Sequence, residues 1–476
     1  MNTNVFFIIH HSSFYFFLTE VVMDYDLIII GAGPGGYVAA IRAGQVGLKT
    51  ALIDKSAVGG MCLNWGCIPT KAWLESAGRL ELVKNAATFG VTGIDEEKLG
   101  FDWPAAVKRS EGIVKRLTRG IEFLLKKNGV EVIMGAASIN ADRSVSVENR
   151  LLTAKNIIIA AGSRPAALPP AVPADMKVEL EELLKLETLP EWIVVWGGGA
   201  HAVELAQFFK MAGKTVTLLA EEDALIPQAD PFLSGYALKM LKKSKIEVVL
   251  SAKIKGFEKG EILVESGAEK MKQIAYDKII NASNRAAVLP ASAVELAMEN
   301  GFIKVNEDLQ TSVENIYAVG DVNGMCMFAH AASAQGLHAV NVISGIRSEQ
   351  PFKIERFPIN IYTRPEMAQV GLTESQIKEA NLEYKVSEFP LTANSKALIQ
   401  GETEGLIRML SDKKYGEVLG VQVIAPHATD MIAEAAILLQ LEGTVYDVAR
   451  TIHAHPTISE IFMEAGYDAF DQPIHK

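Results

Sequence analysis

The feature that most constrains the fold of this chain is a pattern that occurs twice. An apolar run leads into a glycine-rich turn, an alanine-rich helical segment follows, and a second apolar run ends the unit. The first copy spans residues 27–53 with the turn GAGPGG at 31–36, and the second spans 193–219 with the turn GGGAHA at 197–202. Two such strand–helix–strand units predict an α/β fold with two doubly wound, Rossmann-like sheets, each with a dinucleotide site at its glycine turn.

The composition excludes several classes of protein. A formal net charge of −11 argues against a nucleic-acid-binding protein, which needs a basic surface to neutralise phosphates. Three cysteines in 476 residues are too few for a secreted disulfide scaffold. We therefore expect a cytoplasmic protein, without nucleic-acid partners and without a metal site.

The first 22 residues differ in character from the rest. They are rich in aromatic residues, contain no Lys or Arg, and are interrupted by two histidines and two serines. A secretory signal needs a basic start and an unbroken apolar core, and the apolar run is also short for a membrane span. We expect residues 1–22 to be an extension outside the fold, with an uncleaved membrane anchor as the alternative reading.

The first glycine turn fits the dinucleotide fingerprint. Gly31 permits a tight turn, Gly33 lets the backbone approach a pyrophosphate, and Gly36 lets the helix pack on the strand. Asp54 ends the next apolar run, at the spacing where an acid bonds a ribose hydroxyl. A glycine-rich surface turn is the alternative, and it fits the flanking strand and helix poorly.

A cysteine pair follows in residues 59–71, GGMCLNWGCIPTK. Cys62 and Cys67 are five residues apart on one loop-to-helix turn, within reach of a disulfide. A zinc site would need further ligands, and no nearby Cys or His supplies them. A redox pair and two inert buried thiols remain the two interpretations of the spacing.

The cysteine segment resembles the redox loop of the class I pyridine nucleotide–disulfide oxidoreductases, in particular that of their dihydrolipoamide dehydrogenase branch. The similarity runs from about Met23 to the C-terminus. Residues 311–321, TSVENIYAVGD, resemble the second FAD motif of the family, and residues 327–330 resemble the segment that lies against the flavin ring. The resemblance implies that Lys71 sits near the flavin N5 and that Glu204 is its carboxylate partner.

The resemblance also implies two sets of cofactor-binding residues. The FAD set is Gly31, Gly33, Gly36, Asp54, Lys55, Lys71, Ala137, Ala161, Gly162, Ser163, Gly320, Asp321, Met327, Ala329 and His330. The NAD set is Gly197, Gly199, Ala202, Glu204, Glu221 and Asn284.

Residues 453–460, HAHPTISE, carry a candidate base. Histidine titrates near neutral pH, and a carboxylate on its other ring nitrogen fixes the tautomer and raises the basicity. In the family the histidine before Pro-Thr is the base and a glutamate five residues on orients it, which implies His455 and Glu460, with His453 structural. This segment reaches into the partner subunit in the family, so a homodimer is implied. Cys326 is interpreted as a buried structural thiol.

The second glycine turn is less regular than the first. Ala202 replaces the third glycine, and His201 stands where the family has an aliphatic residue. Counted from Gly197 as from Gly31, the ribose-binding acid should be residue 220, but an alanine is found there with Glu221 beside it. No arginine lies in 220–226 to accept a 2′-phosphate, so we expect NAD rather than NADP.

Taken together, the resemblance implies a catalytic set of Cys62, Cys67, His455, Glu460, Lys71 and Glu204. The reaction implied is FAD-dependent oxidation of dihydrolipoamide through a Cys62–Cys67 disulfide, with hydride transfer to NAD. The lipoyl group would come from a carrier protein of a 2-oxoacid dehydrogenase or glycine cleavage complex. The alternatives are another NAD(P)H-dependent disulfide reductase of the family, or a flavoprotein redox sensor or scaffold with impaired nicotinamide turnover.

The domain boundaries follow from the motifs and the proline-rich crossings. After the extension (1–22), we expect an FAD-binding domain (23–165), an NAD-binding domain (166–287), a central segment that completes the FAD site (288–355), and a C-terminal α+β dimerisation domain (356–476). Within the first domain, residues 74–127 have a helical pattern throughout.

Overall fold

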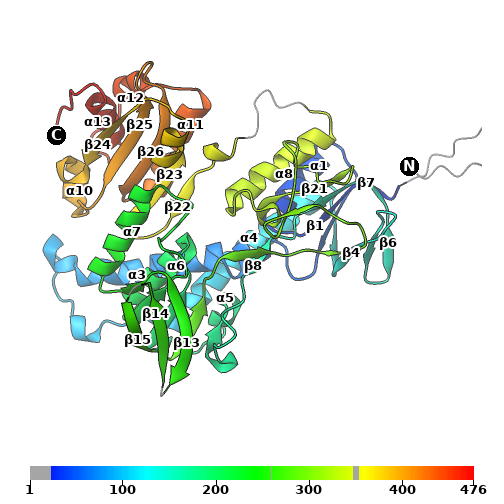
Figure 1. Cartoon of the computed structure of the whole chain (residues 1–476), viewed down its shortest axis with the longest axis horizontal. Helices are drawn as coiled ribbons and strands as arrows, with labels where there is room; N and C mark the ends of the chain where they lie inside the picture. The colour runs from blue at the N-terminus through cyan, green and yellow to red at the C-terminus, as the bar shows by residue number, and fades with distance from the viewer. Residues whose placement is uncertain (1–22, 259, 268, 347–352) are drawn as a thin grey trace, which may run out of the picture. The chain divides into compact units, whose positions relative to one another are not determined.

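The computed structural model describes residues 23–258, 260–267, 269–346 and 353–476, so the predicted extension at 1–22 lies outside the described residues (Figure 1). These residues form two compact units that alternate along the chain. Of the described residues, unit 1 contains 23–60, 120–162 and 287–346, and unit 2 contains 61–119, 163–286 (apart from 259 and 268) and 353–476. Across the described ranges, no helix is long and apolar enough to cross a membrane.

Unit 1 is organised around a five-stranded parallel sheet in which β1 is central (Figure 1). In spatial order the strands are β21 (Ile316–Ala318), β7 (Ala154–Ile159), β1 (Tyr25–Ile30), β2 (Thr50–Asp54) and β3 (Glu131–Met134). A parallel sheet is covered on both faces, which explains the continuous apolar run of β1. Helix α1 (Pro34–Gln45) packs against α8 (Ala329–Ile343), where Gly35 and Gly336 allow close approach.

A second sheet of unit 1 is formed by shorter strands, which run in the order β18 (Ala291–Ser292), β4 (Ala137–Ile139), β5 (Val145–Val147) and β6 (Arg150–Leu152). A small pair is formed by β19 (Met298–Glu299) and β20 (Phe302–Ile303).

Unit 2 repeats the parallel plan. Its strands lie in the order β12 (Glu247–Val249), β11 (Thr215–Leu219), β10 (Trp192–Trp196), β16 (Lys278–Asn281) and β9 (Lys177–Val178). Helix α6 (Ala200–Met211) follows β10 as α1 follows β1. Smaller strands add an antiparallel sheet of β13 (Ala252–Glu258), β14 (Glu261–Ser266) and β15 (Glu269–Ala275), and the pair β8 (Ser163–Pro165) with β17 (Arg285–Ala287).

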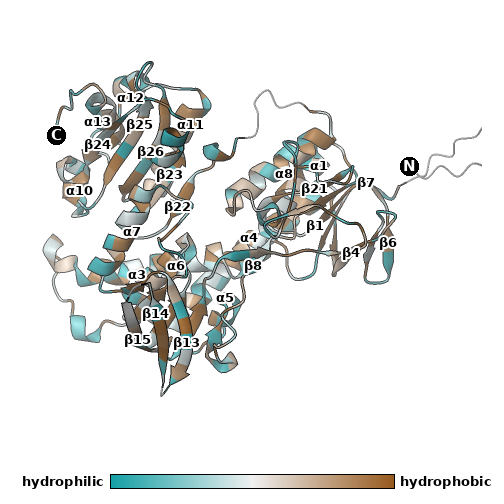
Figure 2. Ribbon diagram, in the orientation of Figure 1, coloured by the Kyte–Doolittle hydropathy of each residue, from teal (hydrophilic) through white to brown (hydrophobic). Residues whose placement is uncertain are grey.

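The C-terminal part of unit 2 is an antiparallel sheet covered by helices. Figure 2 shows hydrophobic residues concentrated along its strands, of which β26 is buried at nearly every position. The strands lie in the order β22 (Ile359–Ile361), β23 (Glu366–Gly371), β26 (Val418–Ala425), β25 (Leu406–Asp412) and β24 (Tyr384–Pro390). The helices are α9 (Glu374–Glu379), α10 (Ser395–Gln400), α11 (Ala428–Gln440), α12 (Val445–Arg450) and α13 (Glu460–Asp468). The predicted class, two Rossmann-like sheets and a C-terminal α+β domain, is confirmed.

The prediction of helix throughout residues 74–127 is wrong. Helix α3 (Cys67–Lys84) ends before a segment with two short 3₁₀ turns, and α4 (Trp103–Lys127) begins after it. Gly90 and Gly93 adopt φ of +79° and +85°, a left-handed conformation that ends helical hydrogen bonding. The two helices are joined through their side chains instead, because the Trp73 ring meets the Trp103 ring edge-on at 4.9 Å between centroids.

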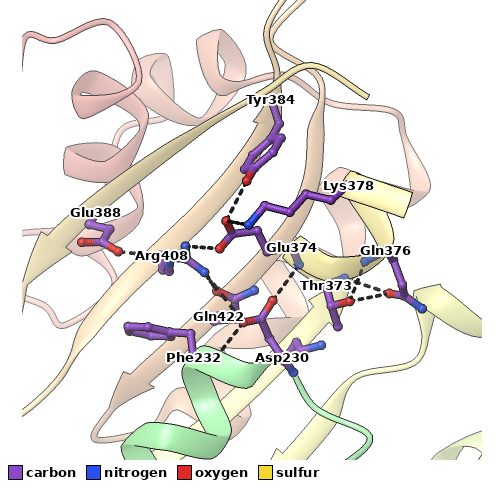
Figure 3. A network of polar contacts seen from close by, with 11 residues as sticks. Asp230, Phe232, Thr373, Glu374, Gln376, Lys378, Tyr384, Glu388, Arg408 and Gln422 are labelled. Carbon is purple, nitrogen blue, oxygen red and sulfur yellow. Dashed lines mark hydrogen bonds and ion pairs between the residues drawn. The ribbon is translucent and has the colours of Figure 1, made fainter. Parts of the chain in front are cut away.

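A polar network fixes the C-terminal sheet to helix α7 (Pro231–Lys243) of the same unit (Figure 3). Asp230 is buried, caps α7 by accepting from the Phe232 amide at 2.9 Å, and accepts from the Glu374 amide at 2.7 Å. Arg408 on β25 contributes the buried cation: its Nη2 lies 2.5 Å from Glu374 Oε2. Its Nη1 lies 3.8 Å from Asp230 Oδ1, and Nε lies 3.1 Å from Glu388 Oε1.

We expect Arg408→Met to destabilise the protein by about 3–5 kcal/mol, because it leaves the buried Asp230 and the partly buried Glu374 without their cation. Denaturant unfolding followed by circular dichroism measures the change. The matched control is Lys378→Met, which removes an exposed cation, 2.7 Å from the same Glu374, and should change the unfolding midpoint little. Equal effects of the two substitutions would contradict a structural role for the buried pairs.

Candidate active site

The first glycine turn, in unit 1, has room for a ligand at one position only. A β-carbon on Gly31 would lie 2.2 Å from the Ala160 carbonyl oxygen, and one on Gly36 would lie 1.7 Å from the Gly31 carbonyl oxygen. A β-carbon on Gly33 would meet nothing within 4 Å. Gly33 also precedes the first residue of α1, so the open side of the turn faces a helix N-terminus, which favours an anion.

Asp54 stands at the end of β2, beside this turn. Its Oδ2 accepts a hydrogen bond from the Ala32 amide at 2.7 Å, and its Oδ1 accepts from the Ser56 amide at 2.7 Å. The neighbouring Lys55 is exposed. The carboxylate is therefore held against the second residue of the glycine turn by the backbone on both of its sides.

The residues predicted to complete this nucleotide site also lie in unit 1, except for Lys71 and Ser163. Gly320, with φ of +76°, donates its amide to buried Gln335 at 2.6 Å, which ties the 3₁₀ turn Gly320–Asn323 to helix α8. Ser163 belongs to unit 2, where its hydroxyl accepts from Arg285 Nε at 2.6 Å. Six other residues of the predicted FAD set are partly exposed: Ala137, Ala161, Gly162, Asp321, Met327 and Ala329. His330 is exposed, and its ring stacks on that of Phe328 at 5.4 Å between centroids.

The cysteine pair lies at the start of α3 in unit 2. Cys62 is on the short helix α2 (Gly60–Asn64), and Cys67 is the first residue of α3. Both are free thiols, and they are hydrogen-bonded to one another through their side chains. The α3 N-terminus is held by the Gly66 amide, which donates to the Met61 carbonyl at 2.7 Å.

Lys71 lies one helical turn after Cys67 and forms an ion pair with the buried Glu204 of α6. Lys71 Nζ is 2.6 Å from Glu204 Oε2, and the Glu204 side chain is 2% exposed. Glu204 Oε1 accepts from the Tyr362 amide at 2.9 Å, and Lys71 Nζ lies 4.9 Å from the centre of the Tyr362 ring. Sequence reasoning missed Tyr362, because its backbone supplies the contact and the residue type carries no signal.

The electrostatics of this cluster polarise the two thiols in opposite directions. The hydrogen bond from Cys62, together with the positive charge of Lys71, outweighs burial and lowers the pKa of Cys67 to about 7. The same hydrogen bond, together with burial, raises the pKa of Cys62. Burial opposes the charge of Glu204, but Lys71 overcomes it and lowers the pKa of Glu204 to about 2. With a pKa of about 7, Cys67 is partly ionised at neutral pH, while Cys62 stays a thiol.

His455 and Glu460 are paired at the other end of unit 2. His455 Nδ1 lies 2.9 Å from Glu460 Oε1, and Glu460 Oε2 accepts from the Thr457 amide at 2.8 Å. The His455 side chain is 71% exposed. His453 is buried and bound to Glu434 at 2.9 Å through its Nε2. Among the described residues, no hydrogen bond or ion pair joins His455 to either cysteine of the same chain.

Cys326 differs from the sequence expectation. It was expected to be buried, but it is only partly so, because it lies in the open segment between the turn at 320–323 and helix α8. Partial burial raises the pKa of the Cys326 thiol to about 11, so Cys326 remains a thiol at neutral pH.

The second glycine turn follows the geometry of the first. A β-carbon on Gly197 would lie 2.0 Å from the Ala282 carbonyl oxygen, whereas one on Gly199 would meet nothing within 4 Å. Ala202 is fully buried in α6, so this helix accommodates a β-carbon where Gly36 of α1 has no room for one. His201 lies with its Nδ1 at 3.8 Å from Glu204 Oε2, and its buried Nε2 has no hydrogen-bond partner among the described residues.

The acidic residues after β11 are arranged differently from the sequence expectation. Glu221, the predicted ribose ligand, is exposed. Glu222 instead turns toward Gly198, and its Oε1 accepts from Asn284 Nδ2 at 2.5 Å. Sequence reasoning did not select Glu222, because the position of its carboxylate depends on how residues 221–226 fold back.

Both turns thus fit a dinucleotide: each has an open glycine at a helix N-terminus, a closed glycine before it and a carboxylate nearby. The residues that would hold FAD are those at the turn of unit 1, and those that would hold NAD are at the turn of unit 2. A thiol pair with one stabilised thiolate adds the capacity for thiol–disulfide exchange, in which the thiolate is the reactive species.

Comparisons with known proteins agree with this chemistry. The sequence profile of the pyridine nucleotide–disulphide oxidoreductase family matches residues 25–336, and that of its dimerisation domain matches residues 357–466. The dihydrolipoyl dehydrogenase of Rhizobium etli is 36% identical over 479 residues, which cover 95% of this chain and 99% of that protein. The dihydrolipoyl dehydrogenase of Thermus scotoductus is 38% identical over 464 residues, covering 95% and 98%.

Solved structures share the fold. LpdA from Mycobacterium tuberculosis superposes with a TM-score of 0.81 at 24% identity, covering 92% of this chain and 98% of that one. The HOCl-induced flavoprotein disulfide reductase RclA from Escherichia coli gives 0.78 at 24% identity, with the same coverage. The chain therefore belongs to the pyridine nucleotide–disulphide oxidoreductase family, as an oxidoreductase of the dihydrolipoyl dehydrogenase type whose cofactors are FAD and NAD.

Proposed function

We propose that this chain oxidises dihydrolipoamide, carried on a lipoyl-bearing protein of a 2-oxoacid dehydrogenase or glycine cleavage complex, and transfers the electrons to NAD. The observation that carries the proposal is the polarised cysteine pair. Cys67 ionises near neutral pH and Cys62 does not, which suits a disulfide that is opened from one end. The two relatives of this chain named above, which are covered over 99% and 98% of their length, are dihydrolipoyl dehydrogenases.

The dithiol step assigns a different role to each cysteine. With the Cys62–Cys67 bond formed, a substrate thiolate attacks Cys62 Sγ, and the bond electrons leave on Cys67. A thiol of low pKa is the better leaving group, so the low pKa of Cys67 favours this direction of opening. The second substrate thiolate then attacks the sulfur bound to Cys62. The lipoyl disulfide is released, and both cysteines are left reduced.

His455 is the proposed base for the substrate thiols. Glu460 holds its Nδ1, so the proton is taken up at Nε2 on the exposed side of the ring. Because the imidazole is exposed and its tautomer is fixed, His455 can act at a site whose other residues belong to a second molecule. We therefore propose a homodimer in which His455 of one subunit serves the cysteine pair of its partner, and residues 357–466 match a dimerisation domain.

Lys71 and Glu204 complete the proposed machinery. Lys71 stabilises the Cys67 thiolate, and Glu204 holds Lys71 in place while its other oxygen is anchored by the Tyr362 amide. When bound, FAD supplies the two-electron acceptor that links the dithiol to NAD. The acidic net charge and the low number of cysteines support a cytoplasmic location.

The proposal is tested by an assay of NADH formation from free dihydrolipoamide with the purified, FAD-loaded protein. Turnover with NAD supports it. Turnover with a different disulfide and NADPH would favour another reductase of the family, and no turnover with either nicotinamide would favour a redox sensor, the reading that the irregular second turn motivates.

The first prediction concerns the thiolate. In Cys62→Ser, the serine hydroxyl can still donate the hydrogen bond to Cys67, so the long-wavelength absorbance of a Cys67 thiolate beside the flavin should appear as pH rises, with a midpoint of about 7. In Cys67→Ser it should be absent at every pH. Adding Lys71→Met to Cys62→Ser removes the cation and should move the midpoint up to about pH 8–10. An unchanged midpoint would show that Lys71 does not stabilise the thiolate.

The second prediction concerns the base. His455→Gln should slow dihydrolipoamide oxidation by about 10²–10⁴-fold, the range for loss of a general base, while NADH reduces the flavin at the wild-type rate. His475→Gln is the matched control, because His475 also pairs a carboxylate through Nδ1, at 2.6 Å from Glu464. Stopped-flow measurement of both half-reactions separates the effects. Equal losses in both would indicate a folding or assembly defect instead.

A further inference from the structure

The two glycine turns of this chain can be compared residue by residue, because the same sequence plan builds both. Gly31 corresponds to Gly197, so Ala32 corresponds to Gly198. In unit 1 the Asp54 carboxylate lies at this second residue, where it accepts from the Ala32 amide at 2.7 Å. In unit 2 the residue equivalent to Asp54 is Ala220, which is buried and has no carboxylate.

A carboxylate is nevertheless present at the equivalent place in unit 2. A β-carbon on Gly198 would lie 2.7 Å from Glu222 Oε2 and 3.2 Å from the Ala220 β-carbon. The Glu222 side chain thus returns to the space into which a longer side chain at position 220 would extend. Glu222 Oε2 is buried and accepts no hydrogen bond from the residues that the structure describes.

The backbone and one amide hold Glu222 in this position. The Ile226 amide donates to the Gly198 carbonyl at 2.7 Å, which folds the loop back over the turn. The Ser251 amide donates to the Glu222 carbonyl at 2.8 Å, and Asn284 Nδ2 donates to Glu222 Oε1 at 2.5 Å. One carboxylate oxygen is therefore fixed by the protein, and the other is left as a free acceptor beside the glycine turn.

We propose that Glu222, positioned by Asn284, replaces the missing acid at 220: it binds the adenosine ribose of NAD and discriminates against NADP. This inference rests on the proposed use of NAD. The free Oε2 accepts a hydrogen bond from a ribose hydroxyl, as acids do at dinucleotide-binding turns. A 2′-phosphate offers no such hydroxyl and is repelled by the carboxylate. Among the described residues, no Lys or Arg forms an ion pair with Glu222 that would offset this repulsion.

The test compares Glu222→Gln with Glu221→Gln in the FAD-loaded protein. Both remove one negative charge from adjacent positions, but Glu221 is exposed, whereas the Glu222 carboxylate lies against Gly198. Dissociation constants for NADH and NADPH come from the concentration dependence of flavin reduction in stopped flow. We expect Glu222→Gln to weaken NADH binding about tenfold, the difference between a charged and a neutral hydrogen bond, and to reduce the preference over NADPH. Glu221→Gln should stay within about twofold of wild type.

A rescue variant guards against misfolding as the cause. Ala220→Glu, added to Glu222→Ala, places an acid at the position that Asp54 occupies in unit 1, in the space that the Glu222 side chain has vacated, and should restore most of the NADH affinity. Unchanged or tighter NADH binding by Glu222→Gln would overturn the assignment, as would an equal loss in Glu221→Gln. Wild-type flavin that neither NADH nor NADPH reduces would instead contradict the proposed function as a whole.

Discussion

The ion pair between Lys71 and the buried Glu204 sets the properties of the cysteine site in unit 2. Removing two charges from water is costly unless each is fully paired, and here Glu204 is also bound by the Tyr362 amide. The pair joins α3 to α6, so the helix that begins at Cys67 is tied to the helix that begins at the second glycine turn. It also places a positive charge near Cys67, and this charge makes a thiolate available at neutral pH.

Because the glycine turn occurs twice in this chain, the second copy can be compared directly with the first. In both turns the first glycine is closed by a backbone carbonyl and the glycine before the helix is open. The differences therefore stand out: Ala202 is accommodated where Gly36 is required, and the carboxylate at the second turn comes from Glu222 rather than from the strand end. The irregular sequence of the second turn is thus compatible with a complete nucleotide site.

The C-terminal sheet is fixed to the rest of unit 2 by charges rather than by apolar contacts alone. Arg408 and Asp230 are both buried, and each satisfies groups from more than one element. Such a junction resists small displacements, because buried charges tolerate little loss of pairing. His455, by contrast, is held only by Glu460 and presents its ring outward, which suits a residue that acts on another molecule.

The sequence by itself determined the two Rossmann-like sheets and the cysteine pair, because glycine spacing and the alternation of strand and helix are local properties of the chain. It failed where a local pattern was ambiguous, as in residues 85–102, where left-handed glycines interrupt a helical periodicity. Only the tertiary structure decided the opposite pKa shifts of Cys62 and Cys67, since these depend on the hydrogen bond between the two side chains, on their burial and on the charge of Lys71. Lys71 is in turn held by Glu204, 133 residues away. The tertiary structure alone also placed Glu222 rather than Glu221 against Gly198, because contacts with Ser251 and Asn284 orient that loop, and no pattern within the loop encodes them.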